Sequence, residues 1–378
     1  MAPQGCSVCP TMTHTHSLRT SLLSALLLAG CGQPAASDDA ARLLRLQLAE
    51  AGLQVFTPSR LSLGFTVETG SGEPVAGLTS SAFDIYEDGM KVSEYESQRS
   101  IQPRAHRSRM YSLVLMDLSG SILRAGELPR LREAALAYVS RVLSEGGEAQ
   151  RVALAGFDGR GTLRTIVDFT GDLSVLQSGL DSLGVAECTV NADCAGNLEA
   201  RSCAGGMCVD DSTNLNGAVL AGLSSLDAAV KGDTAIPYRQ GALVVFTDGT
   251  DQAARVDAAT TKDAVKTSPL HVFTVGLGGE SDEAALRAFG KDGYESASEM
   301  AGLSTAFDAI ARRVAAMANR FYVLDYCSPK RNGRHALRVV ANVAATEGFT
   351  LSGSLEESFD ATGFSSGCEI PRDGSANP

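Results

Sequence analysis

The central part of the sequence alternates short apolar runs with segments of helical periodicity, between residues 108 and 317. Apolar runs typical of buried strands lie at 111–116, 151–157, 163–169, 242–246 and 270–275. Helical spacing of apolar residues appears at 128–143, 173–183, 215–230, 256–265, 283–289 and 303–317. Near-continuous apolar strands that alternate with helices are typical of a parallel sheet covered on both faces. We therefore predict an α/β fold with a doubly wound, mainly parallel sheet over 107–319.

A polar motif follows the first of these strands and precedes a helix. It has the pattern D-x-S-x-S and contains Asp117, Ser119 and Ser121. These side chains are expected at the carboxyl end of a parallel strand, where open α/β sheets bind ligands. Two further oxygen-bearing residues have similar settings, since Thr213 lies just before a helix and Asp248 directly follows another strand.

Together, these five residues resemble the metal-ion-dependent adhesion site of von Willebrand factor A (VWA) domains. The resemblance implies that Ser119, Ser121 and one of Thr213 or Asp248 bind the metal directly. Asp117 and the other member of that pair would then act wholly or partly through water. Two carboxylates and three hydroxyls are hard oxygen donors that suit octahedral Mg²⁺, with Mn²⁺ or Ca²⁺ as alternatives. The family's open metal position implies a partner protein that offers an Asp or Glu carboxylate.

Strand-like patterns flank the α/β region on both sides. Before it, polar and apolar residues alternate at 61–68, and after it strand patterns return at 321–326, 335–343 and 349–354. Both flanks resemble the segments around the VWA domain in many bacterial proteins. Neither flank alone has enough strands to be comfortably stable. We therefore predict that 53–106 and 320–370 pair into one β-sandwich-like domain, with two separate β-units as the alternative.

The N-terminal segment has the pattern of an export signal. Its apolar run at 21–30 is too short to span a bilayer and ends in small residues before Cys31. This ending resembles the lipobox of bacterial lipoproteins, which implies removal of 1–30, lipidation of Cys31 and a tether over 31–52. A lipid-anchored protein of the cell envelope, in the outer membrane or facing the periplasm, is therefore expected. A short buried helix is the alternative interpretation.

The cysteine count fits export. Of nine cysteines, six remain if the signal is removed and Cys31 is lipidated, and an even number suits an oxidising compartment. Four of them have the spacing C-x5-C-x8-C-x4-C within a predicted insertion at 185–210. A zinc site is the alternative there, but the segment lacks paired C-x2-C motifs and histidine. Among three connectivities we favour Cys188–Cys203 with Cys194–Cys208, and Cys327–Cys368 would close a separate loop.

The insertion ends shortly before Thr213, so it is expected near the metal. Two interpretations remain open for it: part of a recognition rim, or a decoration without contacts to a partner.

Composition and motifs argue against nucleic-acid binding and catalysis. The 378 residues carry a formal charge of −12 and contain no long basic tract, so affinity for a phosphate backbone is not expected. The histidines that remain after processing are His106, His271 and His335, and none lies in a recognisable nucleophile motif. The sequence also lacks G-x-S-x-G and H-E-x-x-H. We therefore expect no catalytic residues.

The sequence thus favours a non-enzymatic, adhesion-type binding module on a lipid-anchored envelope protein. The alternative is an envelope assembly or scaffold component in which the metal is largely structural. An unrecognised metallohydrolase ranks last, because we can name no general base near Asp117.

Overall fold

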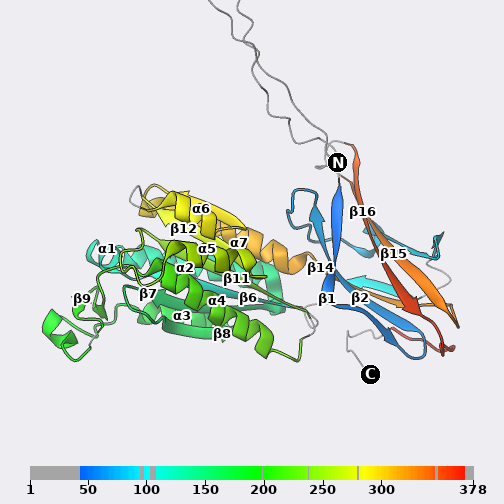
Figure 1. Cartoon of the computed structure of the whole chain (residues 1–378), viewed down its shortest axis with the longest axis horizontal. Helices are drawn as coiled ribbons and strands as arrows, with labels where there is room; N and C mark the ends of the chain where they lie inside the picture. Colours follow the sequence, from blue (N-terminus) through cyan, green and yellow to red (C-terminus); the bar gives the residue numbers. More distant parts are fainter. Residues whose placement is uncertain are drawn as a thin grey trace, which may run out of the picture. The chain divides into compact units, whose positions relative to one another are not determined.

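The computed structural model describes residues 43–93, 98–102, 108–197, 199–236, 238–278, 281–344 and 348–370. Within them, a six-stranded sheet has the order β13-β12-β11-β6-β7-β8 (Figure 1). Its strands are β6 (Ser108–Asp117), β7 (Gln150–Phe157), β8 (Arg164–Thr170), β11 (Tyr238–Thr247), β12 (His271–Leu277) and β13 (Gly293–Ala297). Neighbouring strands are parallel except for β7 and β8. The central strands are almost entirely buried, as their continuous apolar sequences predict.

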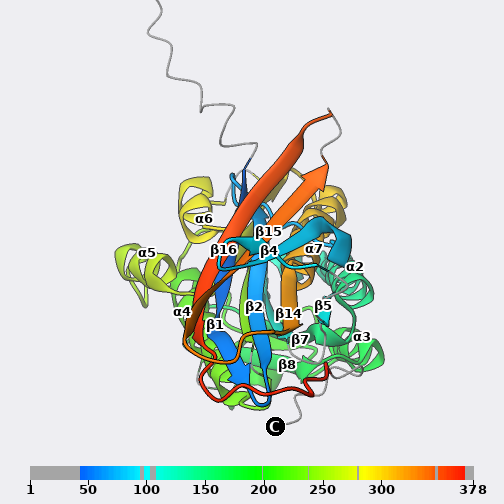
Figure 2. The same ribbon diagram turned by 90° about the vertical axis from the view of Figure 1, so that its right-hand side faces the viewer.

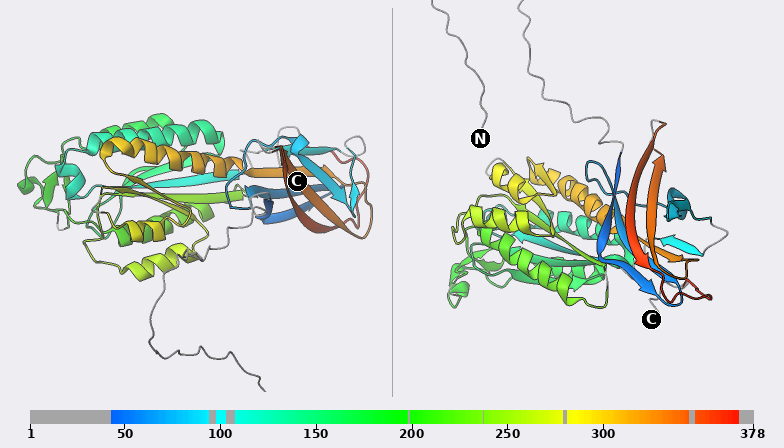
Figure 3. Two further views of the ribbon diagram at one scale, coloured as in Figure 1. Left: turned by 90° about the horizontal axis from the view of Figure 1, so that it is seen from above. Right: turned by 45° about the vertical axis from the view of Figure 1, so that its right-hand side comes forward.

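Helices cover both faces of this sheet (Figure 3, left). Successive residues of β6 point to opposite faces: Val114 and Met116 pack in one core with α2 and α7, and Leu113 and Leu115 pack in another with α4. The helices are α1 (Gly120–Arg124), α2 (Leu128–Gly146), α3 (Leu173–Ser182), α4 (Leu215–Gly232), α5 (Ala258–Thr267), α6 (Glu283–Phe289) and α7 (Leu303–Asn319). Each apolar helical stripe is thereby buried against the sheet or a neighbouring helix.

Two antiparallel four-stranded sheets enclose a separate core (Figure 2). One has the order β1-β2-β14-β5, with β1 (Leu44–Phe56), β2 (Arg60–Thr69), β14 (Phe321–Cys327) and β5 (Arg99–Gln102). The other has the order β16-β15-β3-β4, with β16 (Thr350–Asp360), β15 (Arg334–Ala344), β3 (Phe83–Glu87) and β4 (Met90–Lys91). Aromatic rings of Phe65, Phe83 and Tyr322 pack together between them.

The strand pairing joins the N- and C-terminal segments, because β14 lies between β2 and β5, and β15 pairs with β3. The predicted fold class is therefore confirmed: a doubly wound, mainly parallel sheet flanked by a β-sandwich-like domain built from both terminal segments.

Some boundaries and elements differ from the sequence-based expectation. Strand β1 begins at Leu44, so the predicted tether over 31–52 is wrong in its last part and the β-domain starts before residue 53. Strand β13 and the short helix α1 were not predicted, because Gly293–Ala297 has no apolar run and α1 has only five residues. The signal at 1–30, Cys31 and His106 lie outside the described residues.

The Cys-rich segment folds as a small disulfide-linked unit beside α1. It contains the hairpin β9 (Ser202–Ala204) and β10 (Met207–Val209). The segment also contains the short 3₁₀ turn η4 (Asn191–Cys194), and similar turns elsewhere are η2 (Ser80–Ala82), η3 (Gly147–Ala149) and η5 (Met300–Gly302). In the part of the chain that the structure describes, no helix has both the length and the apolar character needed to cross a bilayer.

Candidate functional site

The D-x-S-x-S loop leaves the carboxyl end of β6 with its first carboxylate fully buried. Asp117 is 0% exposed. Its Oδ1 accepts a hydrogen bond from the backbone N–H of Ser119 at 2.9 Å, and its Oδ2 accepts one from the Thr247 hydroxyl at 2.6 Å. Each carboxylate oxygen therefore has a donor that fixes the orientation of the group.

A chain of hydroxyl groups connects this loop to Asp248. The Oγ atoms of Ser119 and Ser121 lie 3.1 Å apart, and the Ser121 hydroxyl donates to Oδ1 of Asp248 at 3.0 Å. The approach follows from the sheet, because β6 and β11 are adjacent parallel strands with Met116 opposite Phe246. Their carboxyl ends, and the polar residues that follow, must then lie side by side.

Thr213 reaches the same place from the loop before α4. Its carbonyl accepts the N–H groups of Gln252 and Ala253 at 2.8 and 3.0 Å, which ties this loop to the one after β11. Its hydroxyl oxygen lies 3.9 Å from the point that a Cβ atom on Gly249 would occupy. Thr213 is thus beside Gly249, the residue that follows Asp248, and the structure brings all five predicted residues to one edge of the sheet.

The electrostatics of this edge suit a cation. Burial raises the pKa of Asp117 to about 7, and the negative charge of Asp248 adds to the increase. Two acids that repel each other in a partly desolvated site are stabilised when a positive ion lies between them. The remaining groups are hydroxyls, which are hard neutral donors. The donor set therefore fits a small divalent cation.

Thr247 is the functional residue that sequence reasoning missed. It is 0% exposed and holds the Asp117 carboxylate from the neighbouring strand. Its position in the sequence could have indicated this role, because Thr247 is a hydroxyl residue at the end of an apolar strand and directly before Asp248. If an ion binds here, such a group would orient Asp117 without binding the ion itself.

The Cys-rich insertion contacts the loop that carries the serines. Asp211 directly follows the insertion: its carbonyl accepts the N–H of Gly120 at 3.2 Å, and its carboxylate pairs with Arg124 at 2.5 Å. Arg124 also donates to the Ser202 hydroxyl of β9 at 2.8 Å. The insertion therefore lies next to the candidate site, as its position before Thr213 predicts.

All three disulfides that we favoured are present in the structure. They are Cys188–Cys203, Cys194–Cys208 and Cys327–Cys368. The sulfur atoms of Cys188, Cys194 and Cys208 lie within 4.8 Å of one another, which is the arrangement that a zinc site would also produce. Their pairing as disulfides accounts for this proximity without a metal.

Both histidines in the described residues are held by carboxylates away from this edge. Nδ1 of His271 lies 2.8 Å from Asp292, and Nδ1 of His335 lies 2.7 Å from Asp88. These contacts give both imidazoles a structural partner.

No family model matches this sequence, and no curated protein matches it. Solved structures show similarity at low identity. A von Willebrand factor type A protein from Catenulispora acidiphila is 10% identical over 85% of this chain and 74% of its own, with a TM-score of 0.43. The pilus adhesin SpaC from Lactobacillus rhamnosus GG, in an open conformation, is 10% identical over 84% of this chain and 48% of its own, with a TM-score of 0.41. Proximal thread matrix protein 1 from the mussel byssus, with a zinc-occupied MIDAS motif, is 12% identical over 61% of this chain, with a TM-score of 0.41. The present chain spans about half the length of the last two proteins.

Proposed function

We propose that this protein is a metal-dependent protein-binding module of the adhesion type. The observation that carries the proposal is the convergence of two carboxylates and three hydroxyls, from three separate loops, at the carboxyl edge of the central sheet. One of the carboxylates is fully buried, and its raised pKa marks a site where a cation is favoured.

The residues that would hold the ion are Asp117, Ser119, Ser121, Thr213 and Asp248. Mg²⁺ is the proposed ion because small hard cations prefer oxygen donors, and Mn²⁺ or Ca²⁺ could take the same set. When bound, the ion would supply a positive centre that attracts a carboxylate from a partner protein. The chain's own contribution is orientation, since Thr247 and the N–H of Ser119 hold Asp117 in place.

A binding role is preferred to catalysis because no histidine of the described residues lies at this edge. The one arginine that contacts the serine loop, Arg124, is paired with Asp211. His271 and His335 are engaged elsewhere by Asp292 and Asp88. We therefore propose that the protein is not an enzyme.

The disulfide-linked insertion is proposed as the rim that selects the partner. A single carboxylate on a metal attracts many acidic proteins, so selectivity must come from surrounding contacts. The insertion is adjacent to the serine loop through Arg124, and it exposes the apolar side chains Val185 (68%) and Val190 (56%). Replacing both valines by serine should weaken partner binding while Mg²⁺ uptake stays unchanged.

Attachment to the cell envelope is part of the same proposal. It rests on the lipobox-like sequence before Cys31 and on three disulfides, which fit an oxidising compartment. Mass spectrometry of the protein isolated from membranes would detect the lipidated Cys31.

Two measurements test the central proposal. Calorimetry with Mg²⁺ should show uptake of one ion by the wild type and none by the Asp248→Ala variant. A pull-down from envelope extracts should then recover a partner that EDTA releases. Absence of cation uptake by the folded wild type would overturn the proposal, and a partner retained in EDTA would favour the scaffold alternative.

A further inference from the structure

Helix α1, which carries part of the candidate site, is too short to be stable by itself. It has five residues, and its N-cap Ser119 makes no side-chain cap hydrogen bond. Isolated helices shorter than about 12–15 residues are marginal in water. Ser121, a proposed metal ligand, lies in this helix, and Ser119 directly precedes it. The positions of both hydroxyls therefore depend on what packs around α1.

The Cys-rich insertion forms part of the wall against which α1 packs. Leu123 is buried in the same core cluster as Met207 and Val209 of the insertion hairpin. The turn of this hairpin also approaches α1 closely, because a Cβ atom at Gly205 would lie 3.2 Å from Cδ2 of Leu123. The insertion thus contributes to holding α1 against the sheet.

Arg124, the last residue of α1, connects three parts of the candidate site. Its Nη2 lies 2.5 Å from the carboxylate of Asp211, on the loop that continues to Thr213. The same nitrogen donates to the Ser202 hydroxyl of β9 at 2.8 Å. A single guanidinium nitrogen therefore joins the helix that carries Ser121, the loop that carries Thr213 and the insertion.

The ion pair lies against Gly120, which separates the two proposed serine ligands. A Cβ atom at Gly120 would lie 2.7 Å from Oδ1 of Asp211 and 2.9 Å from Nη1 of Arg124. The Gly120 N–H also donates to the carbonyl of Asp211 at 3.2 Å. Glycine leaves room for this close approach, since it has no Cβ atom. The backbone between the two serines is therefore held by contacts with Arg124 and Asp211.

We propose that Arg124 is a positioning residue through which the Cys-rich insertion sets the cation affinity of the site. Arg124 does not bind the ion. It holds the backbone at Gly120, and thereby the hydroxyls of the serine loop, in the arrangement that a cation needs. This inference rests on the proposed metal site. Such coupling is reciprocal, so a partner that holds the insertion in place would also tighten cation binding.

Calorimetry with Mg²⁺ on the full chain tests the proposal with the Arg124→Met variant. We expect its Mg²⁺ affinity to fall about fivefold or more, within the range for coupling through packed networks. The free energy of unfolding in EDTA, measured with urea, should stay close to the wild-type value, because both side chains of the ion pair are about half exposed. Arg124→Lys should bind Mg²⁺ more tightly than Arg124→Met, since both contacts come from one nitrogen atom that an ammonium group can replace.

Arg132→Met is the matched control, because the ion pair of Arg132 with Asp181 joins α2 to α3 and not to α1. Wild-type Mg²⁺ affinity in Arg124→Met, or an equal loss in Arg132→Met, would overturn the inference.

Amide hydrogen exchange in EDTA separates this inference from the metal site itself. The Gly120 N–H should exchange about fivefold faster or more in Arg124→Met, since exchange reports local opening of the backbone. Exchange at the wild-type rate would contradict the role given to Arg124. If the folded wild type takes up no Mg²⁺, the proposed function fails, whereas normal uptake by both the wild type and Arg124→Met contradicts this inference alone.

The Ser202→Ala variant tests the route through the insertion, because it removes the hydroxyl that accepts from Arg124. Mg²⁺ affinity should fall at least about twofold when Ser202→Ala is made in the wild type, and no further when it is made in Arg124→Met, since residues that act through one contact are not additive. Equal losses in both backgrounds would show that the insertion does not act through Arg124.

Discussion

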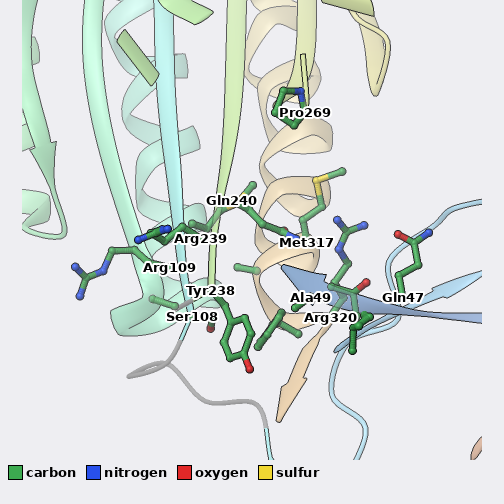
Figure 4. Close-up of a pocket in the computed structure, with 16 residues that line it drawn as sticks. Gln47, Ala49, Ser108, Arg109, Tyr238, Arg239, Gln240, Pro269, Met317 and Arg320 are labelled. Carbon is green, nitrogen blue, oxygen red and sulfur yellow. The ribbon is translucent and has the colours of Figure 1, made fainter. Parts of the chain in front are cut away.

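The two edges of the central sheet carry opposite chemistry. At the carboxyl edge lie Asp117, Asp248 and their hydroxyl neighbours, whereas three arginines lie at the amino edge, beside a cavity of about 240 Å³ (Figure 4). Helix orientation contributes to this difference. Helices that follow parallel strands begin at the carboxyl edge, and α5 begins there with the acidic N-cap Asp257, whereas α7 ends at the amino edge with Arg320 as its C-cap. Acids are favoured at helix N-termini and cations at C-termini.

The edges also differ in how a buried charge is compensated. Burial lowers the pKa of Arg320, but Glu68 lies against its guanidinium as a counter-ion within the chain. Asp117 is equally buried and faces a second acid, Asp248, so its charge is compensated only by hydrogen bonds. The ion pair of the amino edge is therefore complete within the chain, whereas the carboxyl edge would gain its counter-charge from the cation proposed above.

The largest expected effect concerns the carboxyl edge alone. Asp248→Ala should weaken Mg²⁺ binding by at least about 100-fold, because loss of a coordinating carboxylate costs more than loss of an orienting group. Calorimetric titration measures the change. Asp263→Ala is the control, since Asp263 is an exposed acid on α5 away from the candidate site. If Asp248→Ala kept wild-type affinity, the assignment of this edge as the metal site would fail.

A change at the amino edge should affect stability and not cation binding. A Cβ atom at Gly64 of β2 would lie 2.3 Å from the ring of Tyr238, which is packed against Phe321. Gly64→Ala should therefore lower the free energy of unfolding by about 1–3 kcal/mol, the usual cost of overpacking. Chemical denaturation measures it, with Gly196→Ala as the control because no atom lies within 4 Å of the added methyl group. A large loss of Mg²⁺ affinity in Gly64→Ala would show that the two edges are coupled.

A smaller effect on Mg²⁺ affinity is expected when the hydrogen bond from Thr247 to Asp117, a proposed metal ligand, is removed. Thr247→Val keeps the side-chain volume but removes the hydroxyl that donates to Asp117. Mg²⁺ affinity should fall about tenfold, at the low end of the range for groups that orient metal ligands. Thr260→Val is the matched control, because its hydroxyl bonds Asp257 in the exposed first turn of α5. Unchanged affinity in Thr247→Val would mean that the backbone of Ser119 alone orients the carboxylate.

The sequence predicted the sheet, and the end of it where the five candidate residues lie, because both depend on local patterns. Apolar strands such as 242–246 and the residues that directly follow them locate the carboxyl edge, and Asp117 and Asp248 meet there once the strands are parallel neighbours. Pairing of the terminal segments was also predictable, because neither segment has enough strands alone.

The amino-edge cavity was not predictable in the same way. It forms where the end of α7 and the starts of two strands meet β1, and β1 was placed partly in a tether because 44–52 follows a small polar segment. The Arg320 ion pair with Glu68 spans 252 positions, and no local pattern indicates it. Thr247 was missed for a related reason, since its role is defined by a contact across strands.

The smallest expected effect lies in the β-domain, where the carboxylate of Asp88 has cationic partners that Asp117 lacks. Lys330 at 2.8 Å, the N–H of Ala336 and His335 hold the pKa of Asp88 well below its usual range. A lowered pKa stabilises the fold above the unfolded value of about 3.9, and this stabilisation is lost as the pH falls through the folded value. Asp88→Asn should thus cost stability at pH 5, by less than about 1 kcal/mol because the group is partly exposed.

His335 determines how the stability contributed by Asp88 changes at higher pH. The carbonyl of Asn332 and the carboxylate of Asp88 raise the pKa of His335, so its contribution is present below about 6.5 and is lost as the pH rises through the raised value. The stability difference between the wild type and Asp88→Asn should therefore be largest between about pH 4 and 6.5 and smaller on either side. Urea denaturation across this range measures it, with Asp181→Asn as the control because Asp181 pairs with Arg132 but is 61% exposed. A difference that keeps growing as the pH rises to 8 would contradict the role given to His335, since only the pair with Lys330 should persist there.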